Sequence, residues 1–304
     1  MASDAPLTYP PAASSGPPRI WPALVVVLTA PIVVFGSVYL VSEVFYAVYS
    51  GVVERLDHAD PFNRWLNRSL YMLAVLLPTS TVIALVALIP AALSPVTWWK
   101  RLGLVKTRMP IWMWVLMLMA HLFIAYAIYL VFPGLMENPP EWVTVLAKMI
   151  RESSPGQLVL LCVLISVLPG LAEELLYRGY VQRRLLQRWP AWAAILLPAV
   201  AFAVMHPDPR HMAATLIPGI WMGAVAWYAG SIWPAIACHM LNNLLFVLGT
   251  WFSDSDEAFT TELTASDATW LKISALALFA FVAAAVIRHR AGKSPIAVER
   301  TADQ

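Results

Sequence analysis

Long apolar runs separated by short polar stretches dominate the pattern of this chain. About 20 apolar residues span the hydrocarbon core of a bilayer, and lipid cannot satisfy stray backbone N–H and C=O groups. The pattern therefore predicts an all-α protein, a polytopic membrane bundle of about eight transmembrane helices. The eight predicted segments are residues 22–50, 69–93, 111–132, 157–189, 191–206, 212–229, 232–252 and 269–288.

The polar stretches between these segments suggest five parts. The first is rich in Pro, Ala and Ser, and it lacks the charged start and the cleavage site of a signal peptide. We expect residues 1–20 to be a disordered cytoplasmic tail, 21–156 the amino-terminal transmembrane helices, 157–252 the core helices that carry the candidate site, 253–290 an outer loop and the last transmembrane helix, and 291–304 a cytoplasmic tail.

Composition supports the membrane assignment. Of the 304 residues, 60% are hydrophobic and 12% charged, whereas a soluble domain is nearer half apolar and a quarter charged. The 14 Trp residues suit the headgroup level of a bilayer. A net charge of +2 without a basic block indicates no nucleic acid among the partners. Cys162 and Cys238 fall in apolar runs without metal-ligand spacing, so we interpret them as hydrophobic filler.

Ionisable residues at membrane depth are costly, and each is a candidate for function. Glu43 and His121 stand alone in their helices, and we interpret each as a satisfied structural polar group. Glu173 lies 16 residues before Trp189 and His206 lies 16 residues after Pro190, on the two arms of one predicted hairpin. Both should therefore lie about 24 Å from the turn, at the same depth. His239 lies in the seventh segment at a similar predicted depth, so groups from three helices converge.

Local spacing separates the roles of these residues. Glu174 and Arg178 are four residues apart and can pair on one helical face, which favours a structural role for Glu174. Glu173 points about 100° away, and without that partner it suits a general base. His239 and Asn243 are also four apart, so a ring nitrogen and an amide could stabilise an oxyanion. For Asn243 the alternative is an interhelical hydrogen bond.

The sixth segment contributes packing residues and a further histidine. Gly219 and Gly223 are four apart and should permit close approach of a neighbouring helix. His211 begins this segment beside Asp208 and Arg210, and we expect it to be interfacial, with no catalytic role.

Three short motifs resemble those of a known family. Glu173-Glu-Leu-Leu-Tyr-Arg178 matches the EExxxR motif of the CPBP (CAAX protease and bacteriocin-processing) intramembrane endopeptidases. Phe202-Ala-Val-Met-His206 matches their FxxxH motif, and His239-Met-Leu-Asn-Asn243 their HxxxN motif. The stretch from 170 to 243 holds all three in order, each on its own predicted helix, and the chain is similar to the Ras-converting CAAX endopeptidases.

The resemblance implies an eight-helix fold with a cavity open toward the cytosol and a glutamate-type mechanism. Glu173 and His206 would activate a water, His239 and Asn243 would stabilise the oxyanion, and Glu174, Arg178 and Phe202 would support the site. No metal or other cofactor is favoured. Zinc on Glu173, His206 and His239 is the alternative, because three protein ligands plus water make a catalytic zinc site. The implied partners are the bilayer and a peptide or protein substrate, lipidated in one branch of the family.

Two other classes of protein remain as alternatives to a protease. A non-catalytic membrane scaffold or immunity-type binding protein could keep the fold, although it would need neither a base nor an oxyanion site. A transporter could use intramembrane Glu and His as proton relays, but the chain has no visible inverted repeat.

Basic residues are unevenly divided between the two sides of the predicted bundle. The predicted cytoplasmic side holds 13 of the 20 Lys and Arg residues and the opposite side seven. Since Lys and Arg favour cytoplasmic loops, we expect an integral protein of the cell (plasma) membrane with both termini in the cytosol.

This topology predicts that alkaline phosphatase, which is active only after export, is inactive when fused after Gln304. The same reporter fused after Phe259, in the predicted outer loop, should be active. Robust activity of the carboxyl-terminal fusion would indicate an odd number of crossings or an inverted orientation.

Overall fold

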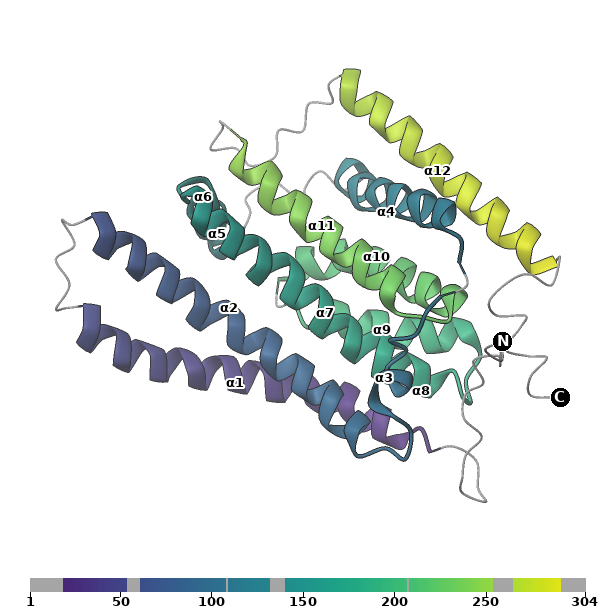
Figure 1. Cartoon of the computed structure of the whole chain (residues 1–304), viewed down its shortest axis with the longest axis horizontal. Coiled ribbons are helices and arrows are strands. Elements are labelled where there is room, and N and C mark those ends of the chain that lie inside the picture. Colours follow the sequence, from purple (N-terminus) through teal and green to yellow (C-terminus); the bar gives the residue numbers. More distant parts are fainter. Residues whose placement is uncertain are drawn as a thin grey trace, which may run out of the picture.

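A computed structural model describes residues 19–53, 61–107, 109–131, 140–206, 208–253 and 265–290 (Figure 1). The described residues form helices joined by short connections. The elements are α1 (Trp21–Val53), α2 (Pro61–Ala92), α3 (Trp98–Arg101), α4 (Ile111–Val131), α5 (Glu141–Arg151), α6 (Pro155–Leu161), η2 (Cys162–Val167), α7 (Leu168–Glu174), η3 (Leu175–Gln182), α8 (Arg183–Leu185), α9 (Ala191–Val204), α10 (Pro209–Ala229), α11 (Trp233–Trp251) and α12 (Ala265–Arg290).

The prediction of a polytopic helical bundle is confirmed, since each of the eight predicted apolar segments coincides with one long helix or helical rod. Five described stretches are long and apolar enough to cross a membrane: Trp21–Val41, Ile111–Ile128, Pro155–Leu185, Pro209–Ala229 and Thr269–Arg288. Leu76–Ala92 and Ala191–Val204 are shorter apolar helices. α11, the remaining predicted segment, is a helix of 19 residues that carries His239 and two asparagines. Residues 1–18 of the predicted tail 1–20, the whole predicted tail 291–304, and residues 254–264 of the predicted outer loop lie outside the described residues.

The amphipathic helix α5 was not predicted. It buries Ala147 and Ile150 and leaves Trp142, Val145 and Lys148 exposed. Because its 11 residues are too few to span a bilayer, a search for long apolar runs passes over it.

The fourth predicted segment is one continuous rod that contains two π-helical stretches. It begins at the capping box of Ser154 and Gln157, in which each side chain bonds the other residue's backbone N–H. The rod then alternates between α-helix and π-helix, with η2 before α7 and η3 after it. Short π segments occur frequently at functional sites. Glu173 and Glu174 therefore lie on a short α segment between two π segments.

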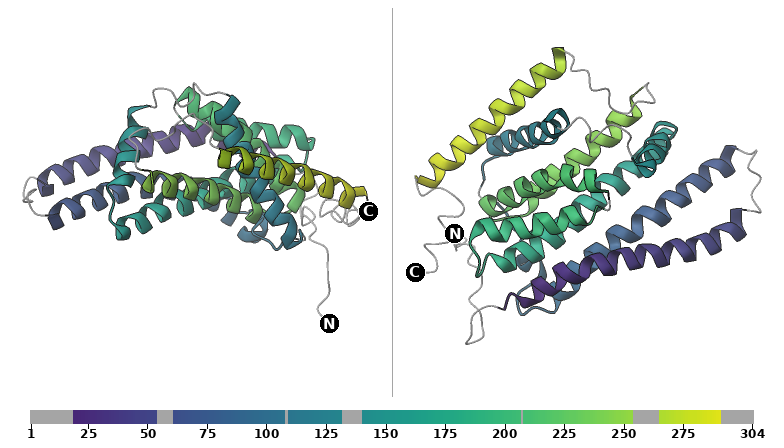
Figure 2. Two further views of the ribbon diagram at one scale, coloured as in Figure 1. Left: turned by 90° about the horizontal axis from the view of Figure 1, so that it is seen from above. Right: turned by 180° about the vertical axis from the view of Figure 1, so that it is seen from behind.

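Two helix pairs flank a central group. α1 packs with α2 on one side and α4 with α12 on the other, while the rod from α6 to α8 lies between them with α9, α10 and α11 (Figures 1 and 2). Glycine permits the closest approaches within this central group. A Cβ built on Gly170 would lie 2.6 Å from Cγ of Met240, so α7 and α11 meet at a distance that other residues would prevent.

One end of the bundle gathers the start of α1, the short helix α3, the α8–α9 turn and the end of α12 (Figure 1). The loop after α3 is tied to the α10–α11 turn at this end. Ile232 N donates to Gly103 O at 3.1 Å, Ser231 Oγ donates to Val105 O at 2.6 Å, and Thr107 Oγ1 donates to Ala229 O at 2.9 Å. Since α1 starts where α12 ends, the described helices cross the bundle an even number of times.

Candidate active site

The Glu174 carboxylate lies at the centre of the site and is completely buried. Arg178 Nη1 donates to Glu174 Oε1 at 2.8 Å, which confirms the pairing expected from their spacing. The other end of the guanidinium is also satisfied, since Nη2 donates to the carbonyl of Gly219 at 2.7 Å. A buried charge needs this degree of pairing and hydrogen bonding to be tolerated.

The Gly219 and Gly223 carbonyls both accept hydrogen bonds from η3. Gln182 Nε2 donates to Gly223 O at 2.8 Å, one helical turn beyond the Arg178 bond to Gly219. A Cβ on Gly219 would lie 3.3 Å from the Phe202 ring, and one on Gly223 would lie 2.9 Å from both Gln182 Oε1 and Ile195 Cγ2. The packing role predicted for the two glycines is confirmed. In addition, their carbonyls are open to the side chains of Arg178 and Gln182.

His239 contacts both glutamates. Its Nδ1 lies 3.0 Å from Glu174 Oε1, and its Nε2 lies 3.8 Å from Glu173 Oε2. Glu174, paired with Arg178, is a carboxylate and can only accept, so Nδ1 of His239 must carry a proton. Nε2 then faces Glu173 either as a lone pair or, in the imidazolium, as a second donor. Sequence spacing did not predict this contact between Glu174 and His239.

The Phe202 side chain packs against three other groups of the site. Its buried ring lies 5.7 Å from the His239 ring and 5.2 Å from the His206 ring, centroid to centroid. The Arg178 guanidinium carbon lies 4.9 Å from its centroid, in a cation–π arrangement. One phenyl ring thus packs against His206, His239 and the Arg178 guanidinium, and the supporting role that the resemblance implies for Phe202 stays a prediction.

His206 lies just beyond the end of α9, which ends at Val204. Its Nδ1 lies 3.1 Å from the carbonyl oxygen of Phe202. Because a carbonyl can only accept, Nδ1 carries the proton and Nε2 presents a lone pair, as a base requires. The expected convergence is therefore partial: Glu173, Glu174 and His239 meet directly, and His206 reaches them through the Phe202 ring.

The Asn243 side chain bonds another helix. Its Nδ2 donates to the carbonyl of Ile165 in η2 at 3.0 Å, which is the interhelical bond considered as the alternative. An amide nitrogen has two N–H groups, so this bond leaves one donor. The role of Asn243 beside His239 in an oxyanion site therefore stays a prediction.

His211, expected to be interfacial with no catalytic role, lies beside the His206 ring. Its ring centroid lies 4.3 Å from that of His206, and on its other side the Trp142 ring of α5 stacks at 5.6 Å. Asp208 caps α10 by accepting from the backbone N–H groups of Arg210 and His211. The five-residue separation of His206 and His211 was the available signal, while nothing in the sequence indicated Trp142.

The two solitary ionisable residues also differ from expectation. His121 in α4 is buried, and neither ring nitrogen has a hydrogen-bond partner among the described residues. It lies near enough to His239 and Arg178 to interact with both electrostatically. The prediction of a satisfied polar group is therefore wrong for His121. Glu43 is exposed on α1 instead of lying inside the bundle.

The zinc alternative requires Glu173, His206 and His239 to surround one point. Within the described part of the chain, no three His, Cys, Asp or Glu side chains are grouped so that they could hold a metal ion. The rings of both histidines pack against the Phe202 ring, and among the described residues His206 makes no contact with Glu173 or His239 of the kind that those two residues make with each other. The arrangement of these residues does not fit a shared zinc ion.

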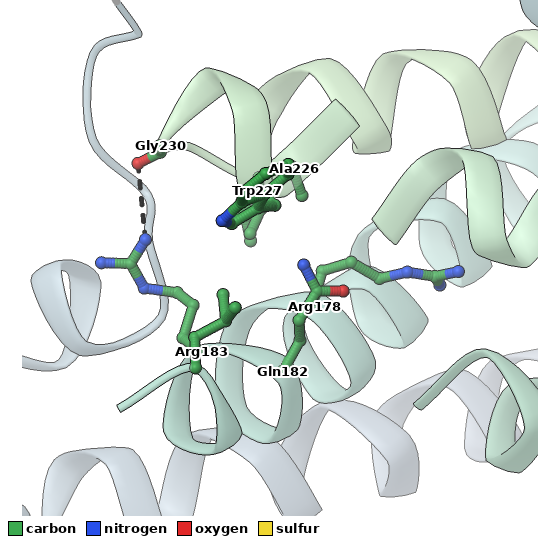
Figure 3. A pocket seen from close by; sticks show the side chains of 8 residues that line it. Arg178, Gln182, Arg183, Ala226, Trp227 and Gly230 are labelled. Atoms are coloured by element: carbon green, nitrogen blue, oxygen red, sulfur yellow. Dashed lines mark hydrogen bonds between the residues drawn. The ribbon is translucent and has the colours of Figure 1, made fainter. Parts of the chain in front are cut away.

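A small cavity lies beside the site, between η3 with α8 and the ends of α10 and α11 (Figure 3). The Arg178 and Arg183 side chains point in opposite directions in this view, and Arg183 Nη1 bonds the Gly230 carbonyl at 3.4 Å. The cavity is lined by Arg178, Gln182, Arg183, Leu186, Ala226, Trp227, Gly230 and Ile232. Glu173, His206 and His239 do not line it.

The unequal burial of the two glutamates predicts unequal effects of their removal. Glu174→Ala would leave Arg178 buried without its partner, and breaking such a pair costs roughly 3–5 kcal/mol. We expect a clearly lower midpoint of thermal unfolding in detergent for Glu174→Ala. The matched change Glu173→Ala should alter the midpoint much less, so equal midpoints would contradict the structural role of Glu174.

The comparison with protein families gives one match. Residues 155–245 match the family described as Rce1-like, type II CAAX prenyl endopeptidase Rce1-like. Neither the curated proteins nor the solved structures contain a match to this chain. The matched residues include all three motifs, and the resemblance to the CPBP endopeptidases is confirmed. Residues 155–245 of this integral membrane protein are thus similar to the Rce1-like type II CAAX prenyl endopeptidases.

Proposed function

We propose that this chain is an intramembrane endopeptidase that hydrolyses a peptide bond of a membrane-associated protein near the cytosolic face of the plasma membrane. The observation that carries the proposal is the contact of Glu173 and Glu174 with His239, brought together from α7 and α11 beneath the Phe202 ring. In this contact, the Glu173 carboxylate is suited to act as a base. It faces His239, whose protonated ring nitrogen is fixed by the Glu174 carboxylate.

In the proposed reaction, Glu173 and His206 activate a water molecule. The water oxygen attacks the peptide carbonyl carbon while its proton passes to one of these two groups. Nε2 of His206 is the ring nitrogen available for this task, because its Nδ1 bonds the Phe202 carbonyl. The C–N bond then breaks, and the same proton is delivered to the departing amine, which leaves a new carboxyl terminus.

The oxyanion formed by the attack needs hydrogen-bond donors other than the groups that activate the water. Because Nδ1 of His239 is directed at Glu174, the ring can donate to an oxyanion only through a protonated Nε2. We therefore propose that His239 acts as an imidazolium, stabilised by the two carboxylates. The second N–H of the Asn243 amide is the proposed second donor, and its bond to Ile165 would orient the amide.

The first experiment is a substrate trap. Glu173→Gln keeps the shape of the side chain but removes the base, so cleavage should fall by at least about 100-fold. Proteins that accumulate uncut in membranes of the variant, identified by mass spectrometry, should be cut by purified wild-type protein. Glu43→Gln, a change on the exposed surface of α1, serves as the control and should cleave normally.

If folded wild-type protein cuts nothing that accumulates, the proposal fails and the scaffold or binding alternative gains support. A lipidated substrate would be recognised in the same experiment by the mass of its modified fragment.

We further propose that catalysis requires no bound metal. Asn243→Ala should lower turnover by about 100- to 1,000-fold, the usual effect of removing one oxyanion donor. Prolonged treatment of the wild type with a strong chelator should leave its activity intact. Stoichiometric zinc in the purified protein, with activity lost on removal and restored on addition, would instead support the zinc alternative at Glu173, His206 and His239.

A further inference from the structure

Three arginines gather at the end of the bundle that holds α3 and α8 (Figure 1). Arg101 comes from α3, and Arg183 and Arg184 come from α8. Arg101 interacts electrostatically with both of the others, and Tyr180 interacts with Arg101 and Arg184. Like charges from two separate elements are thus held close together. We call Arg101, Arg183 and Arg184 the arginine cluster.

The backbone around the cluster is rigidly built. A Cβ on Gly179 would lie 2.8 Å from the Leu102 carbonyl oxygen, so η3 lies directly against the loop after α3. Gly103 has φ +73°, which favours glycine, and the Arg183 side chain packs on it: a Cβ there would lie 2.8 Å from Arg183 Cδ. The Gly103 carbonyl in turn accepts from Ile232 N. The arginines are therefore held by tertiary structure, unlike charges on a flexible loop.

Two members of the cluster, Arg101 and Arg184, have hydrogen-bond donors without acceptors among the described residues. Among the described residues, no carboxylate forms an ion pair with Arg101 or Arg184. The Nε atoms of both side chains are buried and have no hydrogen-bond partner there. Burial, and next the charge of Arg184, lowers the pKa of Arg101. Crowded guanidiniums with unused donors are unfavourable unless an anion joins them.

Tryptophans show where this end meets the bilayer. Trp98 and Trp99 precede the basic residues of α3, are both more than 40% exposed, and pack edge to face. Trp21, Trp192 and Trp233, at the starts of α1, α9 and α11, are exposed at the same end. Exposed Trp is enriched at the headgroup level of membranes. The arginine cluster therefore lies at the depth of lipid phosphates.

We propose that the arginine cluster binds the phosphate of an anionic phospholipid headgroup, bridging α3 and α8. Arginine binds phosphate oxygens through several parallel N–H donors, and basic pockets between transmembrane helices are suited to anionic headgroups. A lipid bound here would neutralise the repulsion between the two elements and stabilise the end of the rod that carries η3. This site is separate from the proposed catalytic groups and does not depend on the proposed function.

Thermal unfolding of the full-length protein in mild detergent tests the site. Phosphatidylglycerol should raise the midpoint of the wild type, since a ligand that binds only the folded state stabilises it. The zwitterionic lipid phosphatidylcholine should not. The rise should be lost in the double variant Arg101→Gln/Arg184→Gln. Arg188→Gln, an exposed arginine one turn beyond Arg184, is the matched control and should keep the rise.

A rise of the same size in the double variant, or none in the wild type, overturns the site. Inorganic phosphate alone producing the full rise would assign it to a soluble anion and overturn the lipid assignment. Native mass spectrometry of the single variants covers the case in which the double variant fails to fold. Each of Arg101→Gln and Arg184→Gln should weaken retention of phosphatidylglycerol by about tenfold, whereas Arg188→Gln should not. Unchanged retention in both single variants would contradict the proposal.

Discussion

The rest of the site depends on the hydrogen bonds that the buried Glu174 carboxylate accepts. Its Oε1 accepts from Arg178 and from His239, so one oxygen joins η3 to α11. Arg178 continues the connection to α10 through the Gly219 carbonyl and lies over the Phe202 ring of α9. Every helix that contributes a candidate residue is thus bound, directly or through one neighbour, to a single negative charge. An anion in such surroundings requires its partners, and this requirement fixes how the helices meet.

The same carboxylate determines what His239 can do. A histidine bonded only to neutral groups could adopt either tautomer, and its role would depend on small changes nearby. Here the acceptor at Nδ1 leaves only Nε2 to face Glu173. Of the two adjacent glutamates, Glu174 therefore orients the ring, and Glu173 is the base in the proposed reaction. His121 lies close to this group without a hydrogen bond of its own among the described residues, and we find no structural account of its position.

The sequence predicted the features that depend on residues close together in the chain. Apolar segment length predicted the helices, and four-residue spacing predicted the Glu174–Arg178 pair and the glycine contacts of α10. Contacts between distant segments were not predictable in this way. Trp142 reaches His211 from 69 positions earlier, and Asn243 bonds Ile165 from 78 positions later. Hydropathy also cannot distinguish an α-helix from a π-helix, because both place apolar side chains in lipid and satisfy their own backbone.

The two π-helical stretches impose a constraint on the length of the rod. Each residue added to or removed from an α-helix turns everything beyond it by about 100°. A π turn holds about one residue more than an α turn, because its hydrogen bonds run from residue i to i+5. Removing one residue from η2 and restoring an ordinary α-helix there would therefore leave both glutamates facing α11. Removing one residue from the α-helical part of the rod before them would instead turn them away from His239. The rod therefore tolerates a change in its number of residues only where a π turn can be gained or lost.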